Sequence, residues 1–104
     1  MALKRWVGQG TTGVQTIHTV PSTDRVLVLG AVIGRTGTDP VNVSLSFEDG
    51  SANVLFKFEV SIASDGPPVT IDNKMVLASN DVIKIDSDVA TFFCHISGDQ
   101  AAVE

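Results

Sequence analysis

The sequence predicts an all-β domain from its composition and from the spacing of its turns. Of 104 residues, 31 are Val, Ile or Thr, whereas Leu occurs six times and Glu three times. β-branched side chains fit pleated strands, while Leu and Glu are preferred in helices. Turn residues recur at intervals of roughly 8–12 residues, which is typical of sandwiches and small barrels. We therefore expect a single jelly-roll-like β-sandwich of eight or nine short strands with an extended N-terminal arm.

In the first half of the chain, apolar runs alternate with turn residues. Residues 14–20 alternate in polarity and end at a turn over 21–24. Residues 26–33 are apolar apart from one glycine, as expected of a strand that is covered on both faces. After the loop 34–40, polar and apolar side chains alternate over 41–47, which indicates a half-buried strand.

The second half continues this pattern from a hairpin-type turn at 48–51. Every second side chain over 54–62 is apolar, and shorter strands are expected at 69–72, 74–78, 82–85 and 89–96. We interpret residues 72–85 as a strand, a tight turn and a strand, that is, as a β-hairpin. The alternation predicts a core made of Val28, Val32, Val43, Leu45, Phe47, Phe56, Phe58, Val60, Leu77, Ile83, Ile85 and Phe93.

The chain is expected to divide into an N-terminal arm at 1–13, the sandwich at 14–97 and a polar tail at 98–104. The arm places apolar and basic side chains before several glycines, in a chain whose net charge is −5. We expect it to bind a neighbouring subunit, with its Trp as the anchor and its basic residues on an acidic surface. The candidate partner-binding residues are Leu3, Lys4, Arg5, Trp6 and Val7. The alternative is that this segment is the first strand of the chain's own sandwich.

Composition argues against several classes of partner and location. The acidic balance argues against a nucleic-acid partner, because phosphate contacts need a basic face. The longest apolar run, 26–33, is too short for a membrane-spanning helix, and no signal-peptide pattern follows Lys4 and Arg5. Cys94 is the only cysteine, so we expect no intrachain disulfide but a buried free thiol in a protein made in a reducing cytoplasm.

No motif predicts catalysis, a metal site or a cofactor. His18 and His95 are 77 positions apart and have no neighbours at ligand spacing. The segment 86–88 lacks the other oxygens of a calcium loop, so we interpret its two aspartates as turn residues. The loop 34–38 lacks the Lys-Ser or Lys-Thr end of a phosphate-binding loop and precedes a strand. We expect a protein that is not an enzyme and has no catalytic residues, metal or cofactor.

Several segments together resemble a known family. Residues 20–24, the apolar strand 26–33 and the segments 72–77 and 81–85 are similar to the pattern of small β-sandwich virion proteins of tailed bacteriophages. The resemblance implies a non-enzymatic structural protein of the virion, made in the host cytoplasm. Its implied role is that of a capsid decoration (cement) protein, which stabilises the phage head by binding the major capsid protein.

The resemblance also implies a homo-oligomer, first a trimer and next a dimer. A sandwich has open edges, and this chain has few charges to protect them. Two alternatives stay open, a neck, tail or fibre module of a phage and a carbohydrate-binding β-sandwich. Sugar-binding modules display an exposed aromatic platform, whereas this chain has one Trp and no Tyr, which favours a virion protein.

Overall fold

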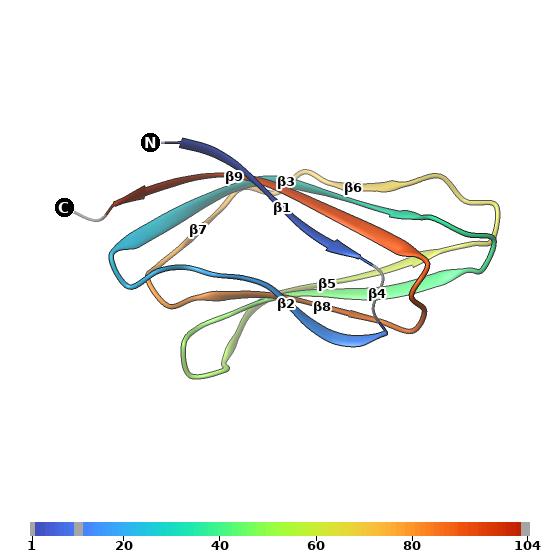
Figure 1. Cartoon of the computed structure of the whole chain (residues 1–104), viewed down its shortest axis with the longest axis horizontal. Helices are drawn as coiled ribbons and strands as arrows, with labels where there is room; N and C mark the ends of the chain where they lie inside the picture. Colours follow the sequence, from blue (N-terminus) through green and yellow to red (C-terminus); the bar gives the residue numbers. More distant parts are fainter. Residues whose placement is uncertain (1, 10–11, 103–104) are drawn as a thin grey trace.

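The computed structural model of the chain describes residues 2–9 and 12–102, which form two antiparallel sheets packed face to face (Figure 1). The strands are β1 (Ala2–Gln9), β2 (Gly13–Thr19), β3 (Asp24–Arg35), β4 (Val41–Glu48), β5 (Val54–Ile62), β6 (Val69–Ile71), β7 (Met75–Leu77), β8 (Val82–Ser87) and β9 (Phe92–Ala102). The predicted all-β sandwich is confirmed. Within the described ranges, no helix is long and apolar enough to span a membrane.

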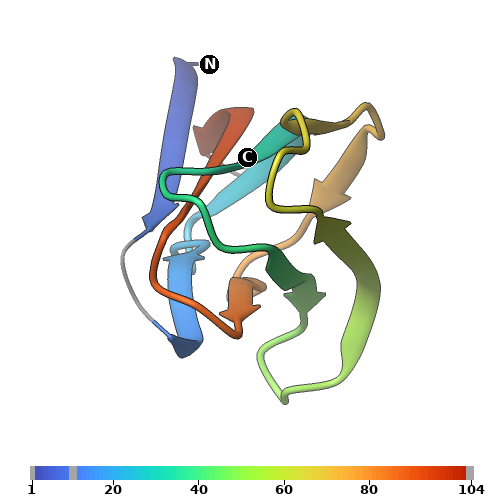
Figure 2. The ribbon, with the colours of Figure 1, turned by 90° about the vertical axis from the view of Figure 1, so that its right-hand side faces the viewer.

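The two sheets have the connectivity of a jelly roll. The five-stranded sheet has the order β1-β9-β3-β6, with β7 also paired to β3, and the four-stranded sheet has the order β2-β8-β4-β5. Because β6 pairs with residues 31–33 of β3 and β7 with residues 26–28, the two short strands share one position beside β3. Viewed along the sandwich, β1 and β2 lie at one side and β5 at the other (Figure 2). The predicted jelly-roll topology is thus confirmed.

Residues 2–9, predicted as part of an arm, form the edge strand of the five-stranded sheet instead. β1 pairs with β9 over its whole length. The alternative interpretation, that this segment is the first strand of its own sandwich, is the arrangement observed. Gly8, one of the glycines of the predicted arm, is buried where a Cβ would lie 3.0 Å from Cδ1 of Ile17. This glycine allows the two sheets to approach closely.

The predicted tail also belongs to the sandwich. Residues 98–102 continue β9: residues 98–100 pair with both β1 and β3, and residues 101–102 pair with β3. Residues 1 and 10–11 of the predicted arm and residues 103–104 of the predicted tail lie outside the described residues.

Trp6 fixes β1 against the sandwich from the inside. Its ring stacks on His18 of β2, with the ring centroids 4.7 Å apart and an angle of 23° between the ring planes. The ring also covers Gly98 of β9, where a Cβ would lie 2.5 Å from Cζ3 of Trp6. The Nε2 atom of His18 donates to Oε1 of Gln100 at 3.1 Å, and Nε2 of Gln100 donates to Oδ2 of Asp24 at 2.7 Å. These contacts join the edge strands of both sheets.

A β-bulge in β3 decides which of its side chains face the core. The register against β9 shifts between Val28 and Gly30. Val28 is buried before the shift and Ala31 and Ile33 after it, so the prediction that Val32 faces the core is wrong. An inserted residue reverses the side-chain alternation of everything that follows it.

Most of the other predicted core residues are buried between the sheets. The fully buried ones are Val28, Val43, Leu45, Phe47, Leu77, Ile83 and Ile85, while Phe58 and Val60 are partly buried against them. The predictions for Phe56 and Phe93 are wrong. Phe56 is 52% exposed, although it pairs with the buried Phe47. On β9 it is Phe92, with Cys94, that faces the core, so Phe93 points outward.

The segment 72–85 is not the hairpin that the sequence suggested. Its two strands, β7 and β8, lie in different sheets, so the turn between them carries the chain across the sandwich. The Asp81 carboxylate accepts a hydrogen bond from the Ala78 N–H at 2.8 Å, and Asn80 has a φ of 71°. Both strands bury apolar side chains, which meet across the core because they come from opposite layers.

Alanine substitutions at Gly98 and Gly34 should have different costs. A Cβ on Gly98 would meet both the Trp6 ring and, at 2.9 Å, the backbone oxygen of Leu27, which cannot move aside. A Cβ on Gly34 would meet only the ring of Phe93, which can rotate away into solvent. We expect G98A to lower the free energy of unfolding by about 2–3 kcal/mol and G34A by less than about 1 kcal/mol, measured by urea denaturation. Equal losses would contradict the arrangement of Trp6.

Cys94 should be unreactive in the folded protein. The side chain is buried, and its burial raises the pKa of the thiol to about 12. Because the thiolate is the reactive form, Ellman's reagent at pH 8 should modify Cys94 only after unfolding in urea. By linkage, the raised pKa also predicts that stability falls as the pH rises above the thiol's unfolded value of about 8.5. Rapid modification under native conditions would mean that β9 has the opposite facing.

Candidate interaction face

The outer face of the five-stranded sheet carries a row of exposed apolar side chains. Leu3 of β1 pairs with Asp99 of β9, Asp99 pairs with Leu27 of β3, and Leu27 pairs with Val76 of β7. These four residues, which we call the outer row, therefore cross four strands in register. Leu3 is 80% exposed, Leu27 37% and Val76 69%. Exposed apolar side chains that lie together in this way mark a candidate contact surface.

Two depressions flank the outer row on the same face. One, of about 220 Å³, includes Leu27, Val76 and Asp99 in its lining. The other, of about 450 Å³, lies farther along the sheet and includes Arg5 and His95. A partner with protruding side chains could fill both, since each opens to solvent.

The outer face of the four-stranded sheet is polar by comparison. Its central strands β4 and β8 carry polar side chains at alternate positions. These are Asn42, Ser44, Ser46, Glu48, Lys84 and Asp86. Lys84 and Glu48 form an ion pair with an Nζ–Oε1 distance of 3.1 Å. Val14 and Val54, which line a depression of about 210 Å³ on this face, are exposed apolar exceptions. The two outer faces therefore differ in chemistry, and the apolar one is the candidate for docking.

Asp99 places an unsatisfied acceptor within the outer row. Its Oδ1 atom is buried and accepts no hydrogen bond from the described residues. A buried polar atom without a partner costs free energy, so such atoms are rare in folded proteins. Asp99 lines the depression between the exposed apolar side chains, so its carboxylate group lies next to any surface that docks there.

The five predicted partner-binding residues do not lie on one face. Along β1, Leu3, Arg5 and Val7 point to the outer face, and they alternate with Lys4 and Trp6. Trp6 is half-buried inside its own sandwich, so it does not project as an anchor in this structure. Partner binding by the five residues stays a prediction.

Sequence reasoning missed Leu27, Val76 and Asp99 as surface residues. The signal that was available is the apolar run 26–33, which predicted a strand covered on both faces. The inner side of that strand is covered by the core, whereas Leu27 on its outer side remains exposed. An apolar strand with one side exposed is typical of a strand whose exposed side is covered by another protein.

The two histidines and Asp88 make contacts with neighbouring side chains of the sandwich. His18 takes part in the Trp6 stack, whereas His95 lies on the outer face in an edge-to-face contact with Phe93, at a centroid distance of 5.4 Å. Asp88 accepts hydrogen bonds from the N–H of Asn42 at 2.9 Å and from its side-chain amide at 2.8 Å, and these lower the pKa of the carboxyl. Across residues 2–9 and 12–102, no three His, Cys, Asp or Glu side chains cluster as metal ligands would.

Comparison with known proteins yields a likeness of fold. No protein-family profile and no curated protein matches the chain. Among solved structures, a chain of the acidic stable capsid structure of Helicobacter pylori bacteriophage KHP30 is similar, with a TM-score of 0.56 and 16% sequence identity. The match covers 99% of this chain and 92% of that chain. The two proteins therefore share a fold over nearly their whole lengths.

Proposed function

We propose that this chain is a non-enzymatic structural protein of a phage virion. More specifically, we propose that it decorates the capsid by binding the major capsid protein through the outer face of its five-stranded sheet. The observation that carries the proposal is the outer row of exposed apolar side chains in Leu3, Leu27 and Val76. The fold likeness to a chain of a phage capsid structure supports the choice of partner. Jelly rolls serve many functions, so the surface rather than the fold must support the mechanism.

Docking on this face would be driven mainly by apolar burial. Full burial of a Leu or Val side chain contributes about 1.5–3 kcal/mol, and the outer row offers three such side chains on a rigid sheet. A preformed strand face loses little conformational freedom on binding, which favours affinity. A donor on the capsid that bonds to the carboxylate of Asp99, which lines the depression, would add direction to a contact that is otherwise non-directional. Arg5, on the same face, adds a positive charge that suits an acidic partner.

The sugar-binding alternative has less support from the site. A carbohydrate platform needs an aromatic ring whose face is open to solvent. Trp6 instead packs on His18 and over Gly98. A neck, tail or fibre position would use the same apolar face, and the choice between these positions and the capsid depends on which virion protein binds.

Removing apolar side chains from the outer row should weaken capsid binding. The double variant L3S/V76S truncates two side chains that are 80% and 69% exposed, so the fold should be unaffected. The matched control is V14S, which removes a 65% exposed Val from the other sheet. In co-sedimentation with capsids assembled from the major capsid protein of the same phage, we expect the double variant to bind at least about tenfold more weakly. V14S should bind like the parent protein.

Two results would contradict the proposal. If the parent protein does not bind the capsids, the decoration role is wrong. If L3S/V76S and V14S bind equally well, the outer row is not the contact surface.

A further inference from the structure

We propose that two copies of this chain pair through strand β5, antiparallel about a two-fold axis at Phe58. The pairing would join two four-stranded sheets into one continuous sheet. This inference concerns the free protein and does not depend on the proposed capsid role. A three-fold axis cannot relate two antiparallel strands, so the proposal selects a dimer rather than a trimer.

The edge of β5 is open and regular. β5 is nine residues long, contains no proline and pairs only with β4 in the described sheets. Its pairing with β4 is in unbroken register from Ile62 to Phe56. Figure 2 shows β5 as the outermost strand on its side of the sandwich. An edge of this kind presents unpaired N–H and C=O groups to another strand.

The other edges are less suited to pairing with themselves. β1 carries adjacent positive charges in Lys4 and Arg5, so two copies of it would repel each other. β2 is interrupted by a register shift between Thr16 and His18. β6 and β7 are three residues each. Unbalanced positive charges, bulges and short strands are the usual protections of a sheet edge. Residues 56–62 of β5 contain no bulge, and their one positive charge, Lys57, is balanced by Glu59.

The charges of β5 are complementary to a second copy of β5. Antiparallel pairing centred on Phe58 places Lys57 of each copy opposite Glu59 of the other, so two ion pairs form across the axis. Lys57 and Glu59 point to the same side, as shown by their 3.6 Å contact within one strand, and both are largely exposed. A shift of the centre by one residue would place Lys opposite Lys or Glu opposite Glu. Opposite charges directly across strands stabilise a pair and like charges destabilise it, so the charges select one register.

The apolar side chains of β5 agree with the same register. Phe56, which is 52% exposed, would lie opposite Val60 of the second copy. Val54, which is 57% exposed, lies beyond the register shift at the start of β5 and is not part of this regular pairing. Leu55 is also 44% exposed, which makes three consecutive exposed apolar residues at the start of an edge strand. Pairing would cover much of this surface, which otherwise invites non-specific association.

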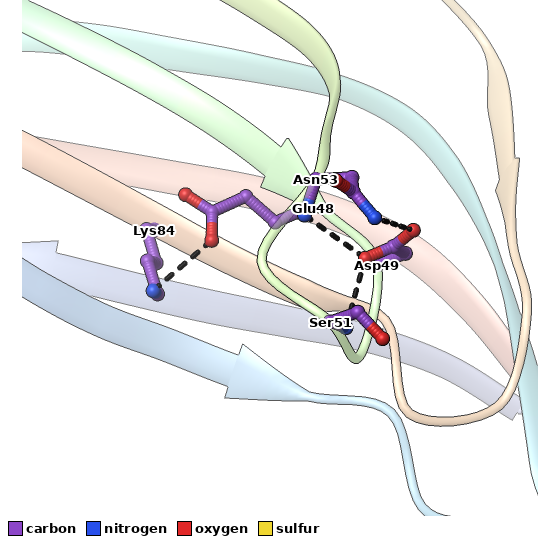
Figure 3. A network of polar contacts seen from close by, with 5 residues as sticks. All are labelled: Glu48, Asp49, Ser51, Asn53 and Lys84. Atoms are coloured by element: carbon purple, nitrogen blue, oxygen red, sulfur yellow. Dashed lines mark hydrogen bonds and ion pairs between the residues drawn. The ribbon is translucent and has the colours of Figure 1, made fainter.

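The turn before β5 holds the strand in place for pairing. Oδ1 of Asp49 accepts hydrogen bonds from the N–H groups of Ser51 at 2.8 Å and Asn53 at 3.0 Å, and Oδ2 accepts one from the Asn53 side-chain amide at 3.1 Å (Figure 3). These bonds lower the pKa of the Asp49 carboxyl. The Glu48–Lys84 ion pair lies beside the turn (Figure 3). β5 is therefore presented as a preorganised strand, which reduces the entropic cost of pairing.

Charge exchange at residues 57 and 59 tests the proposal on the full chain. Sedimentation equilibrium should show a dimer for the parent protein. K57E and E59K should each raise the dimer dissociation constant at least tenfold, because each replaces two attractive contacts with two repulsive ones. The double variant K57E/E59K should restore dimerisation, since the pairs are formed again with the signs exchanged. K74E, which makes the same charge change in an exposed loop, should behave like the parent protein.

The outcomes are decisive without any capsid. Circular dichroism and urea denaturation should show that all four variants are folded. A parent protein that is a monomer at about 100 μM or a trimer would overturn the proposal, and so would single variants that dimerise normally or a double variant that does not recover. Capsid binding is measured separately on the opposite sheet, so a failure of either proposal leaves the other standing.

Discussion

The bulge between Val28 and Gly30 is the constraint on which the arrangement of the five-stranded sheet depends. β3 is the strand of that sheet that pairs with β9, β6 and β7, so its facing sets the facing of its neighbours. Before the bulge, the even-numbered valines fill the core, and Leu27 joins the outer face. After it, Ala31 and Ile33 fill the core. In a strand without the bulge, the even-numbered side chains would face the core along the whole of β3, and Val32 would point inward. The core and the outer face would then each have a different composition.

The contacts of Trp6 hold the edge strand β1 against the rest of the sandwich. The ring spans from β1 to His18 of β2 and lies over Gly98 of β9, so one side chain touches both layers. An aromatic ring over a glycine in a neighbouring strand restores the packing surface that the glycine lacks. Phe93 and Gly34 form a similar pair at the outer face. Both pairs involve β9, which has β1 and β3 as neighbours over residues 93–100.

Local pattern was sufficient to predict the strands but not their partners. The bounds expected for β5 agree with the structure, and the core positions on β4 and β8 follow simple alternation. The errors concern features that depend on pairing between distant segments. Gly30, the one glycine in the apolar run, lies at the bulge in β3, but a glycine in a strand does not by itself establish a change of register. The choice between Phe92 and Phe93 requires the register of β9. The outer row joins residues 3, 27, 76 and 99, which are distant in sequence, so no local motif could have predicted it.

The position of β9 between β1 and β3 has a consequence for synthesis on the ribosome. The first and last strands of the chain are neighbours, and the last one fills the middle of its sheet. While the C-terminal residues are still in the exit tunnel, β1 has no partner in the five-stranded sheet, and β3 has a vacant edge where β9 will insert. Contacts between such distant segments form slowly, because a long loop must close first. The five-stranded sheet therefore cannot be completed until residues 92–102 have left the exit tunnel, so β9 joins it after all of its other strands have emerged.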